Sequence, residues 1–244
     1  MPTIQRMFSR VVVLVLFMAG FCHALNPIEM YKAGGWVMHP ILGLSVIALY
    51  ITVERLLVIV LQKLKLKPTE FVKTLEESVK NNNGDKNAIV AEMEALAQKK
   101  GGLVASILGT TLAKYKDGVA KGLNVVDLKQ WMLQGTETKA SSEIPALETH
   151  LGAIAVISNI ATLLGLLGTV WGLIESFMSI ANSPGGIKAD EMAGGISVAL
   201  ITTAGGLLVA IPSLVLFNWI KSMIENYVLQ IEETVTILID ALTA

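Results

Sequence analysis

Three long runs of apolar residues dominate the pattern of the chain. Residues 151–181 carry a single charged side chain, Glu175, and residues 193–220 carry none. The earlier run at 36–61 holds one pair of adjacent charges near its end. About 20 apolar residues span the hydrocarbon of a bilayer, so the pattern predicts three transmembrane helices. We therefore expect an all-α, polytopic membrane protein.

Small and hydroxylated residues recur inside the last two apolar runs at steps of three and four. Such residues lie along one face of a helix, and in lipid they let two backbones approach closely. We expect the two helices to form a hairpin across a short polar loop, residues 182–192. Six glycines are expected to serve this packing: Gly165, Gly168, Gly172, Gly195, Gly205 and Gly206.

Four threonines in the same two runs are candidates for an ion path. A hydroxyl in a membrane helix can satisfy itself on a carbonyl one turn earlier. One that faces a lumen can instead solvate an ion or orient water. The residues alone leave both interpretations open for Thr162, Thr169, Thr202 and Thr203.

Two segments carry a resemblance to a known family. They are Gly165-Leu-Leu-Gly-Thr-Val-Trp-Gly172 and Gly195-Ile-Ser-Val-Ala-Leu-Ile-Thr-Thr-Ala-Gly-Gly-Leu-Leu-Val-Ala-Ile-Pro212. In sequence and order they resemble the paired signature of the MotA/TolQ/ExbB proton-channel family, and within it the ExbB branch. The triplet Glu54-Arg55-Leu56 also resembles a feature of ExbB-like members.

The resemblance implies an ion-conducting complex of the bacterial inner membrane. In it, a homo-oligomeric ring of five such chains surrounds single helices of an ExbD-like partner, whose aspartate takes the ion. A TonB-like protein then carries the work to the outer membrane. Thr169 and Thr203 match the lumenal ring of the family. The alternatives are a Tol-like envelope complex, a flagellar-type stator, and a helical scaffold that conducts nothing.

One position departs from the family pattern. ExbB and Tol members usually have a glutamate where this chain has Val198. The ion-binding carboxylate must then come from the partner. Because hydroxyl and carbonyl oxygens are ligands that hard cations use, a sodium-driven complex is a second hypothesis.

Composition agrees with the membrane class. The chain is 53% hydrophobic and 16% charged, which is typical of a polytopic membrane protein. A net charge of -1 argues against a nucleic-acid partner. The single cysteine excludes a disulfide framework within one chain. No phosphate-binding loop, catalytic triad or metal-ligand spacing is present, so we expect no enzyme activity, cofactor or metal.

The amino-terminal residues 1–24 are typical of a secretory signal. Arg6 and Arg10 precede a short apolar core at 11–21, and small residues follow where cleavage would occur. An uncleaved interfacial helix and an extra span are the alternatives. Residues 25–35 would then be periplasmic.

Basic residues after the first span predict the orientation. Arg55, Lys63, Lys65 and Lys67 place this end in the cytoplasm by the positive-inside rule. The amino terminus is then periplasmic and the carboxyl terminus cytoplasmic.

Four residues of the spans need separate interpretation. Glu54 and Arg55 are adjacent and point about 100° apart on a helix. We expect neighbouring helices or subunits to hold them, or their side chains to snorkel near the cytoplasmic face, in preference to a role in the ion path. Glu175 is either a carboxylate at the pore mouth or an interfacial anchor. Pro212 is expected to set a kink.

The polar residues 62–150 predict a cytoplasmic helical domain. One helix is expected to begin at Pro68 and to end at a break at residues 81–85, a second to follow up to Lys100, and a third to run from Leu103 to about Lys116. One further helix is expected from Asn124 to His150, bent at most by a proline. The tail, residues 221–244, has an apolar stripe that predicts packing on that helix: Ile224, Val228, Ile231, Val235, Leu238 and Leu242.

Overall fold

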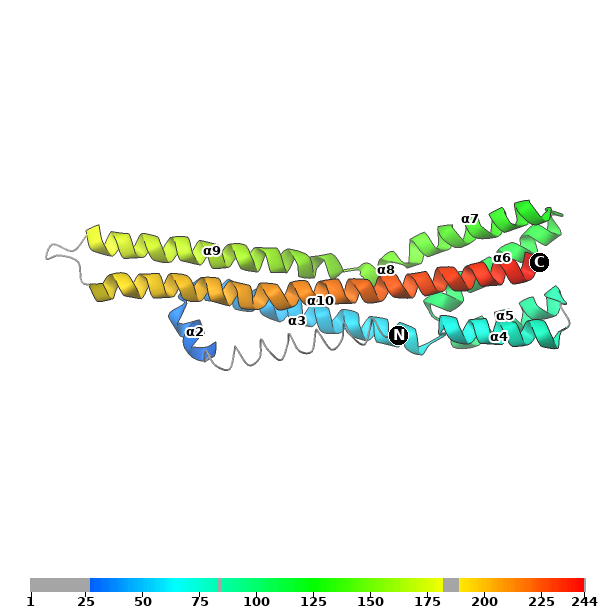
Figure 1. Cartoon of the computed structure of the whole chain (residues 1–244), viewed down its shortest axis with the longest axis horizontal. Coiled ribbons are helices and arrows are strands. Elements are labelled where there is room, and N and C mark those ends of the chain that lie inside the picture. The colour runs from blue at the N-terminus through cyan, green and yellow to red at the C-terminus, as the bar shows by residue number, and fades with distance from the viewer. Residues whose placement is uncertain (1–26, 83–84, 182–188, 244) are drawn as a thin grey trace. The chain divides into compact units, whose positions relative to one another are not determined.

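The structure is a computed structural model that describes residues 27–82, 85–181 and 189–243. Within these ranges the chain forms α-helices and no strand (Figure 1). Three helices are long and apolar enough to cross a membrane. The predicted all-α fold with three long apolar helices is therefore confirmed, and ring formation stays a prediction. The expected signal segment, 1–24, and most of the expected loop, 182–192, lie outside the described residues.

The chain divides into two compact units. The first comprises Met1–Glu54 and His150–Ile220, and the second comprises Arg55–Thr149 and Lys221–Ala244. Two helices, α3 (Met38–Leu64) and α10 (Ala189–Thr243), contribute to both units.

The first unit contains the apolar helices. α9 (Leu151–Ala181) runs antiparallel beside the first part of α10, as Figure 1 shows in yellow-green and orange. Many large apolar side chains of this unit are exposed, among them Leu49, Phe177 and Leu200. Exposed apolar surface on this scale is unusual for a protein in water, and a lipid environment accounts for it.

Two glycines bring α9 and α10 into backbone contact. A Cβ atom at Gly165 would lie 3.2 Å from the Cα of Thr203. A Cβ atom at Gly206 would lie 2.5 Å from the carbonyl oxygen of Ala161. Backbone atoms cannot move aside as a side chain can, so only glycine fits at this separation.

A short helix precedes the first span and was not expected from the sequence. α2 (Pro27–Ala33) ends in a glycine turn, where Gly35 adopts a φ of 66°. Three buried residues then form a small core with parts of α9 and α10. The core consists of Val37, Met38 and Ile41, and Tyr31, Leu164 and Val209 pack against it.

The second unit is a bundle of shorter helices. These are α4 (Pro68–Asn81), α5 (Lys86–Lys100), α6 (Leu103–Ala120), α7 (Val125–Glu143) and α8 (Pro145–Glu148). α5 packs on α4 and α6, and α6 packs on α7. Side chains such as Phe71, Met93 and Leu108 are completely buried, which gives this unit a core of its own.

Two of the expected helix ends are wrong. α6 does not stop near Lys116 but continues to Ala120, and Gly118 lies inside it, where the Leu128 side chain covers it. The expected single helix from Asn124 to His150 is also wrong.

The interruption of that second helix has a local cause. α7 ends at Glu143 and a single turn, α8, begins at Pro145, which has no backbone N–H to donate. Thr149 is then extended, with a ψ of 137°, and His150 has a φ of 61°. Both conformations are incompatible with a continuous helix, so α9 begins anew at Leu151.

The carboxyl-terminal part of α10 packs within the second unit. Its apolar stripe is largely buried, with Ile224, Ile231 and Leu238 no more than 2% exposed. On the adjoining surface, Lys129 of α7 forms an ion pair of 2.8 Å with Asp240 of α10. The packing of this tail on α7 agrees with the stripe seen in the sequence.

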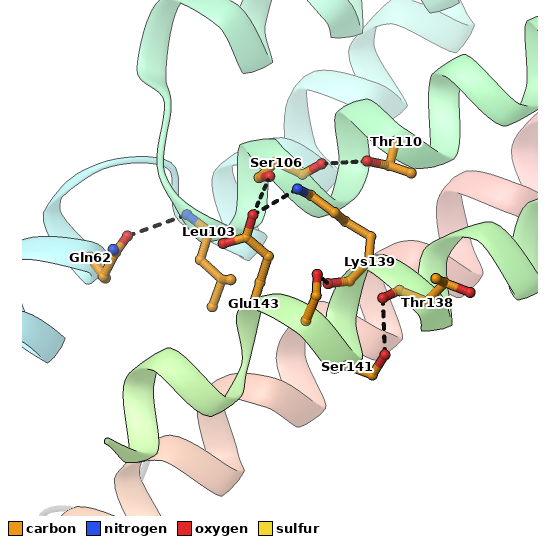
Figure 2. A network of polar contacts seen from close by, with 9 residues as sticks. Gln62, Leu103, Ser106, Thr110, Thr138, Lys139, Ser141 and Glu143 are labelled. Carbon is orange, nitrogen blue, oxygen red and sulfur yellow. Dashed lines mark hydrogen bonds and ion pairs between the residues drawn. The ribbon is translucent and has the colours of Figure 1, made fainter. Parts of the chain in front are cut away.

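A polar network joins α6 and α7 near the end of α3. Figure 2 shows the Glu143 carboxylate between the Lys139 ammonium, at 2.8 Å, and the Ser106 hydroxyl, at 3.1 Å. Both groups donate hydrogen bonds to the carboxylate, Lys139 with the larger effect, and they lower the pKa of Glu143 below its ordinary 4.5. In the same figure, the Gln62 side-chain oxygen accepts from the backbone N–H of Leu103 at 3.3 Å.

Replacing Gly206 with alanine should weaken the packing of α9 on α10. The added Cβ would press on a carbonyl oxygen that cannot move aside, and overpacking of this kind costs about 1–3 kcal/mol. We expect a lower midpoint of thermal unfolding for the chain in mild detergent. Gly194→Ala is the matched control, because a Cβ atom there meets nothing within 4 Å. Equal midpoints for the two variants would contradict the proposed close contact.

Acid should remove the contribution of Glu143 to stability. Because folding lowers the pKa of this carboxyl, its contribution is present above the unfolded value of about 4.5 and is lost as the pH falls towards the folded value. The difference in melting temperature between wild type and Glu143→Gln should be clear near neutral pH and shrink below pH ~4.5. Glu137→Gln, which removes an exposed carboxylate from the same helix, is the matched control. A gap between wild type and Glu143→Gln that is independent of pH would refute the assignment.

Candidate functional site

The candidate ion path lies on α9 and α10 of the first unit. Thr203 of α10 stands at the level where the two backbones touch, and its hydroxyl donates to the carbonyl oxygen of Gly165 on α9 at 3.1 Å. One of the two threonines that match the family ring is therefore bound to the opposite helix.

Thr169, the second threonine of the ring, bonds within its own helix. Its hydroxyl donates to the carbonyl oxygen of Leu166 at 2.6 Å, and the side chain is only partly covered. Thr162, two turns earlier on α9, does the same with Ser158 at 3.1 Å and is exposed. A hydroxyl whose proton is engaged keeps two lone pairs, so both oxygens can still act as ligands.

Thr202 has a different environment from its neighbour. It is 1% exposed, and its hydroxyl donates to the carbonyl oxygen of Ala199 at 2.8 Å. Its side chain covers Gly168, where a Cβ atom would collide with it. The sequence listed Thr202 with Thr203 among the four candidates for the ion path. In the structure Thr202 lies inside the contact between the helices, whereas Thr203 donates across it.

Further contacts join α9 and α10 on either side of Thr203. Ser158 donates to the carbonyl oxygen of Ala210 at 2.7 Å across the interface. Towards the other end, Gly172 and Gly195 lie against each other, since a Cβ atom at Gly172 would be 2.8 Å from the Gly195 carbonyl oxygen. Ser158 is one of the small and hydroxylated residues that recur along α9, but spacing alone does not reveal a partner on another helix.

Gly205 faces a different neighbour from the other glycines. A Cβ atom there would lie 2.9 Å from the Met38 sulfur of α3. This glycine therefore makes room for the first span, whereas Gly165 and Gly206 make room for each other's helices.

Val198 occupies the position where the family usually has glutamate. It is partly buried, and its Cγ1 would lie 3.8 Å from a Cβ atom at Gly35. The side chain thus lies beside the turn between α2 and α3. Valine cannot ionise, so this position supplies no carboxylate of its own.

The two charges of the first span are each engaged by a nearby segment. In the first unit, the Glu54 carboxylate lies 3.6 Å from Nδ1 of His150. In the second unit, the Arg55 side chain is 6% exposed and donates to the carbonyl oxygen of Ala146 at 3.3 Å. This environment resembles the held arrangement that the sequence favoured over a role in the ion path.

Glu175 lies near the far end of α9. It is exposed, and its carboxylate accepts a hydrogen bond of 2.7 Å from the indole N–H of Trp171. Trp171 in turn meets Trp36 edge to face, with ring centroids 5.8 Å apart. Tryptophans concentrate at membrane interfaces, so these contacts favour the interfacial anchor over the pore mouth for this carboxylate.

Pro212 lies within α10, which continues through it without a break. The neighbouring Ser213 donates to the carbonyl oxygen of Val209 at 2.7 Å. Hydroxyls commonly serve the backbone near an intramembrane proline in this way. The expected kink stays a prediction.

The side-chain and backbone groups available at the candidate site determine what chemistry it can perform. In the membrane part of α9 and α10, Glu175 is the one ionisable side chain, and it lies away from the threonines. Hydroxyl and carbonyl oxygens can coordinate a cation or orient water, but they do not bind a proton at neutral pH. A carboxylate from outside the chain would complete the site.

Comparison with known proteins agrees with these features. The model of the MotA/TolQ/ExbB proton channel family matches residues 115–233, which include α9 and much of α10. A biopolymer transport protein ExbB of Aquifex aeolicus is 32% identical over 127 residues, covering 52% of this chain and 84% of the relative.

Two other relatives extend the comparison. An ExbB-like biopolymer transport protein of Synechocystis is 28% identical over 205 residues, covering 83% of this chain and 89% of the relative. The Tol-Pal system protein TolQ of Haemophilus influenzae is 34% identical over 100 residues, covering 39% of this chain and 43% of the relative.

The residues matched by the family model include the helix pair on which the glycines and threonines lie. With its three apolar helices, the chain is a multi-pass protein of the inner membrane, and it belongs to the MotA/TolQ/ExbB proton channel family.

Proposed function

We propose that this chain is the ion-conducting subunit that, with an ExbD-like partner, uses the proton-motive force to energise TonB-dependent transport across the outer membrane. The observation that carries the proposal is the hydroxyl-bearing helix pair that has no acid of its own at the level of Thr169 and Thr203. A partner aspartate would supply the group that gains and loses the ion.

The proposal requires several copies of the chain around the partner. A single α9–α10 pair offers one set of threonines on one side, so a closed path needs a ring, for which we adopt the family's pentamer. The amino terminus would be periplasmic and the carboxyl terminus cytoplasmic, because the basic residues after the first span favour the cytoplasmic side. The second unit would then lie in the cytoplasm.

A Tol-like role in envelope maintenance is the second candidate. The similarity to a TolQ protein favours it, and the same helix pair would serve either role. A flagellar-type stator shares with this chain the absence of an acid at the Val198 position, and sodium could then be the ion, since the available ligands are oxygens.

Removing both ring hydroxyls should strongly reduce conduction without dispersing the complex. Loss of a hydrogen bond to a charged group is worth about 1.5–3 kcal/mol, so ion flux in Thr169→Ala/Thr203→Ala should fall by on the order of tenfold or more. The measurement is flux into vesicles that hold the complex purified from its native host, after size-exclusion chromatography has shown normal assembly.

Two variants serve as controls for this experiment. Thr203→Ser retains the hydroxyl and should retain flux. Thr52→Ala removes a buried hydroxyl of α3 that donates to the carbonyl oxygen of Ala48 in the same helix, and should also conduct. Full flux in the double alanine variant would show that the two hydroxyls are not part of the ion path. Flux that persists with a proton gradient alone, sodium being absent, would support protons and exclude the sodium alternative.

The chain should retain a single-span partner when it is purified in mild detergent from its host. Mass spectrometry of the intact complex would identify the partner and count the subunits. A small partner with a transmembrane aspartate and no cell-wall-binding domain is the expected result. A partner with such a domain would favour a Tol-like or stator role. A ring without any such partner would refute the proposed transduction, because no carboxylate would complete the site.

A further inference from the structure

A cavity of about 510 Å³ lies between α6 and α7 of the second unit. Its volume falls within the range of about 300–1,000 Å³ that is typical of small-molecule sites. Two lysines, an aromatic ring and several hydroxyls line it, among them Lys114, Trp131, Gly135, Thr138, Lys139 and Ser142. The proposed ion path uses none of these residues.

The cavity is built from one stripe on each helix. Trp131, Gly135, Thr138 and Ser142 follow one another on α7 at steps of four, three and four, and therefore share a face. On α6, Thr110 and Lys114 are four residues apart and face them. Figure 2 shows part of this wall, with Thr110 on one helix and Thr138 and Lys139 on the other.

Lys114 brings a positive charge that forms no ion pair among the described residues, although it acts on the Asp117 carboxylate and, after Lys121, helps to lower the pKa of that group. Its ammonium lies 4.2 Å from the centroid of the Trp131 ring, and no ion pair or hydrogen bond found among the described residues involves it. The other two lysines nearby are paired: Lys121 lies 2.8 Å from Asp117, and Lys139 lies 2.8 Å from Glu143. An aromatic face attracts a cation but does not cancel its charge, so this group of side chains keeps one positive charge in excess.

Gly135 holds the Lys114 side chain in place. A Cβ atom at this position would lie 2.6 Å from Cγ and 2.7 Å from Cε of Lys114. No backbone atom of α6 is among its nearest neighbours, so the glycine makes room for the lysine stem and not for a close helix contact. Glycine inside a helix is destabilising relative to alanine. The lysine is thus positioned before any ligand binds, which reduces the entropy that binding would cost.

The remaining lining groups suit an oxyanion. The hydroxyls of Thr110, Thr138 and Ser142 donate to carbonyl oxygens of their own helices, and a hydroxyl can rotate to donate to a ligand instead. Ammoniums of both Lys114 and Lys121 lie 4.2 Å from the centroid of the Trp131 ring. The ring is therefore occupied by cations and is unsuited to stacking on a nucleobase.

From these contacts we propose that the cavity binds a small, soluble anion through its phosphate group, with Lys114 as the principal contact and Lys139 as the second ammonium. Lysine recognises phosphate as a point charge. The phosphate of a lipid head group shares this chemistry, and the experiment below distinguishes the two sources. The proposal is independent of which transport pathway the complex serves.

Titration of the full chain with pyrophosphate tests the proposal. The protein is kept in a mild non-ionic detergent at constant ionic strength, and binding is followed by calorimetry and by the broadening of the phosphorus NMR signal. Saturable binding is expected. Lys114→Gln should weaken it by about tenfold or more, in line with the loss of a charge-assisted contact. Gly135→Ala should also weaken it, because the new methyl group displaces the lysine stem while the charge is retained.

Lys116→Gln provides the matched control. Lys116 lies on the same helix but is paired with Glu94 at 2.6 Å and does not line the cavity, so its loss should leave binding unchanged. Each variant must elute and melt like wild type. Affinity that is equal in wild type and Lys114→Gln, an equal loss in Lys116→Gln, or no binding of pyrophosphate to the folded wild type would each overturn the proposal. Binding only to vesicles that contain phosphatidylglycerol would also overturn it, by assigning the site to a lipid.

Discussion

The contact between the backbones of α9 and α10 is the constraint on which the membrane part of the structure depends. Lipid tails are as apolar as leucine side chains, so no hydrophobic force drives these helices together. They associate because Gly165 and Gly206 leave no side chain between them. That proximity also brings the Thr203 hydroxyl within reach of a carbonyl on the other helix. The small residues and the hydroxyls are therefore parts of one arrangement.

The second unit is stabilised in a different way. Its core consists of large, fully buried side chains such as Phe71 and Leu108, and its surface is joined by ion pairs such as Lys129 with Asp240. Domains in water are usually stabilised in this way, because burial of apolar area drives their folding. One chain thus contains two units that are stabilised in two different ways, one suited to lipid and one suited to water. The boundary between the units falls inside α3 and α10.

The sequence predicts those features that depend on local pattern. The length of an apolar run and the spacing of small residues identify the three long helices and the face shared by α9 and α10. The break before α9 was missed because it depends on the backbone of Thr149 and His150, and neither residue type marks a helix end. The different hydrogen-bond partners of Thr202 and Thr203 could not be predicted, because they depend on how one helix is registered against another. The contact of Lys114 with Gly135 also depends on how two helices pack, α6 and α7. The residue spacing within either helix does not predict it.

The direction of the threonine hydrogen bonds determines what the two hydroxyls offer to a ligand. Thr169 and Thr203 both donate their hydroxyl protons to backbone carbonyls, so each oxygen presents its lone pairs to the surroundings. In this arrangement the two hydroxyls act as acceptors, and each would have to break its backbone hydrogen bond before it could donate to an anion.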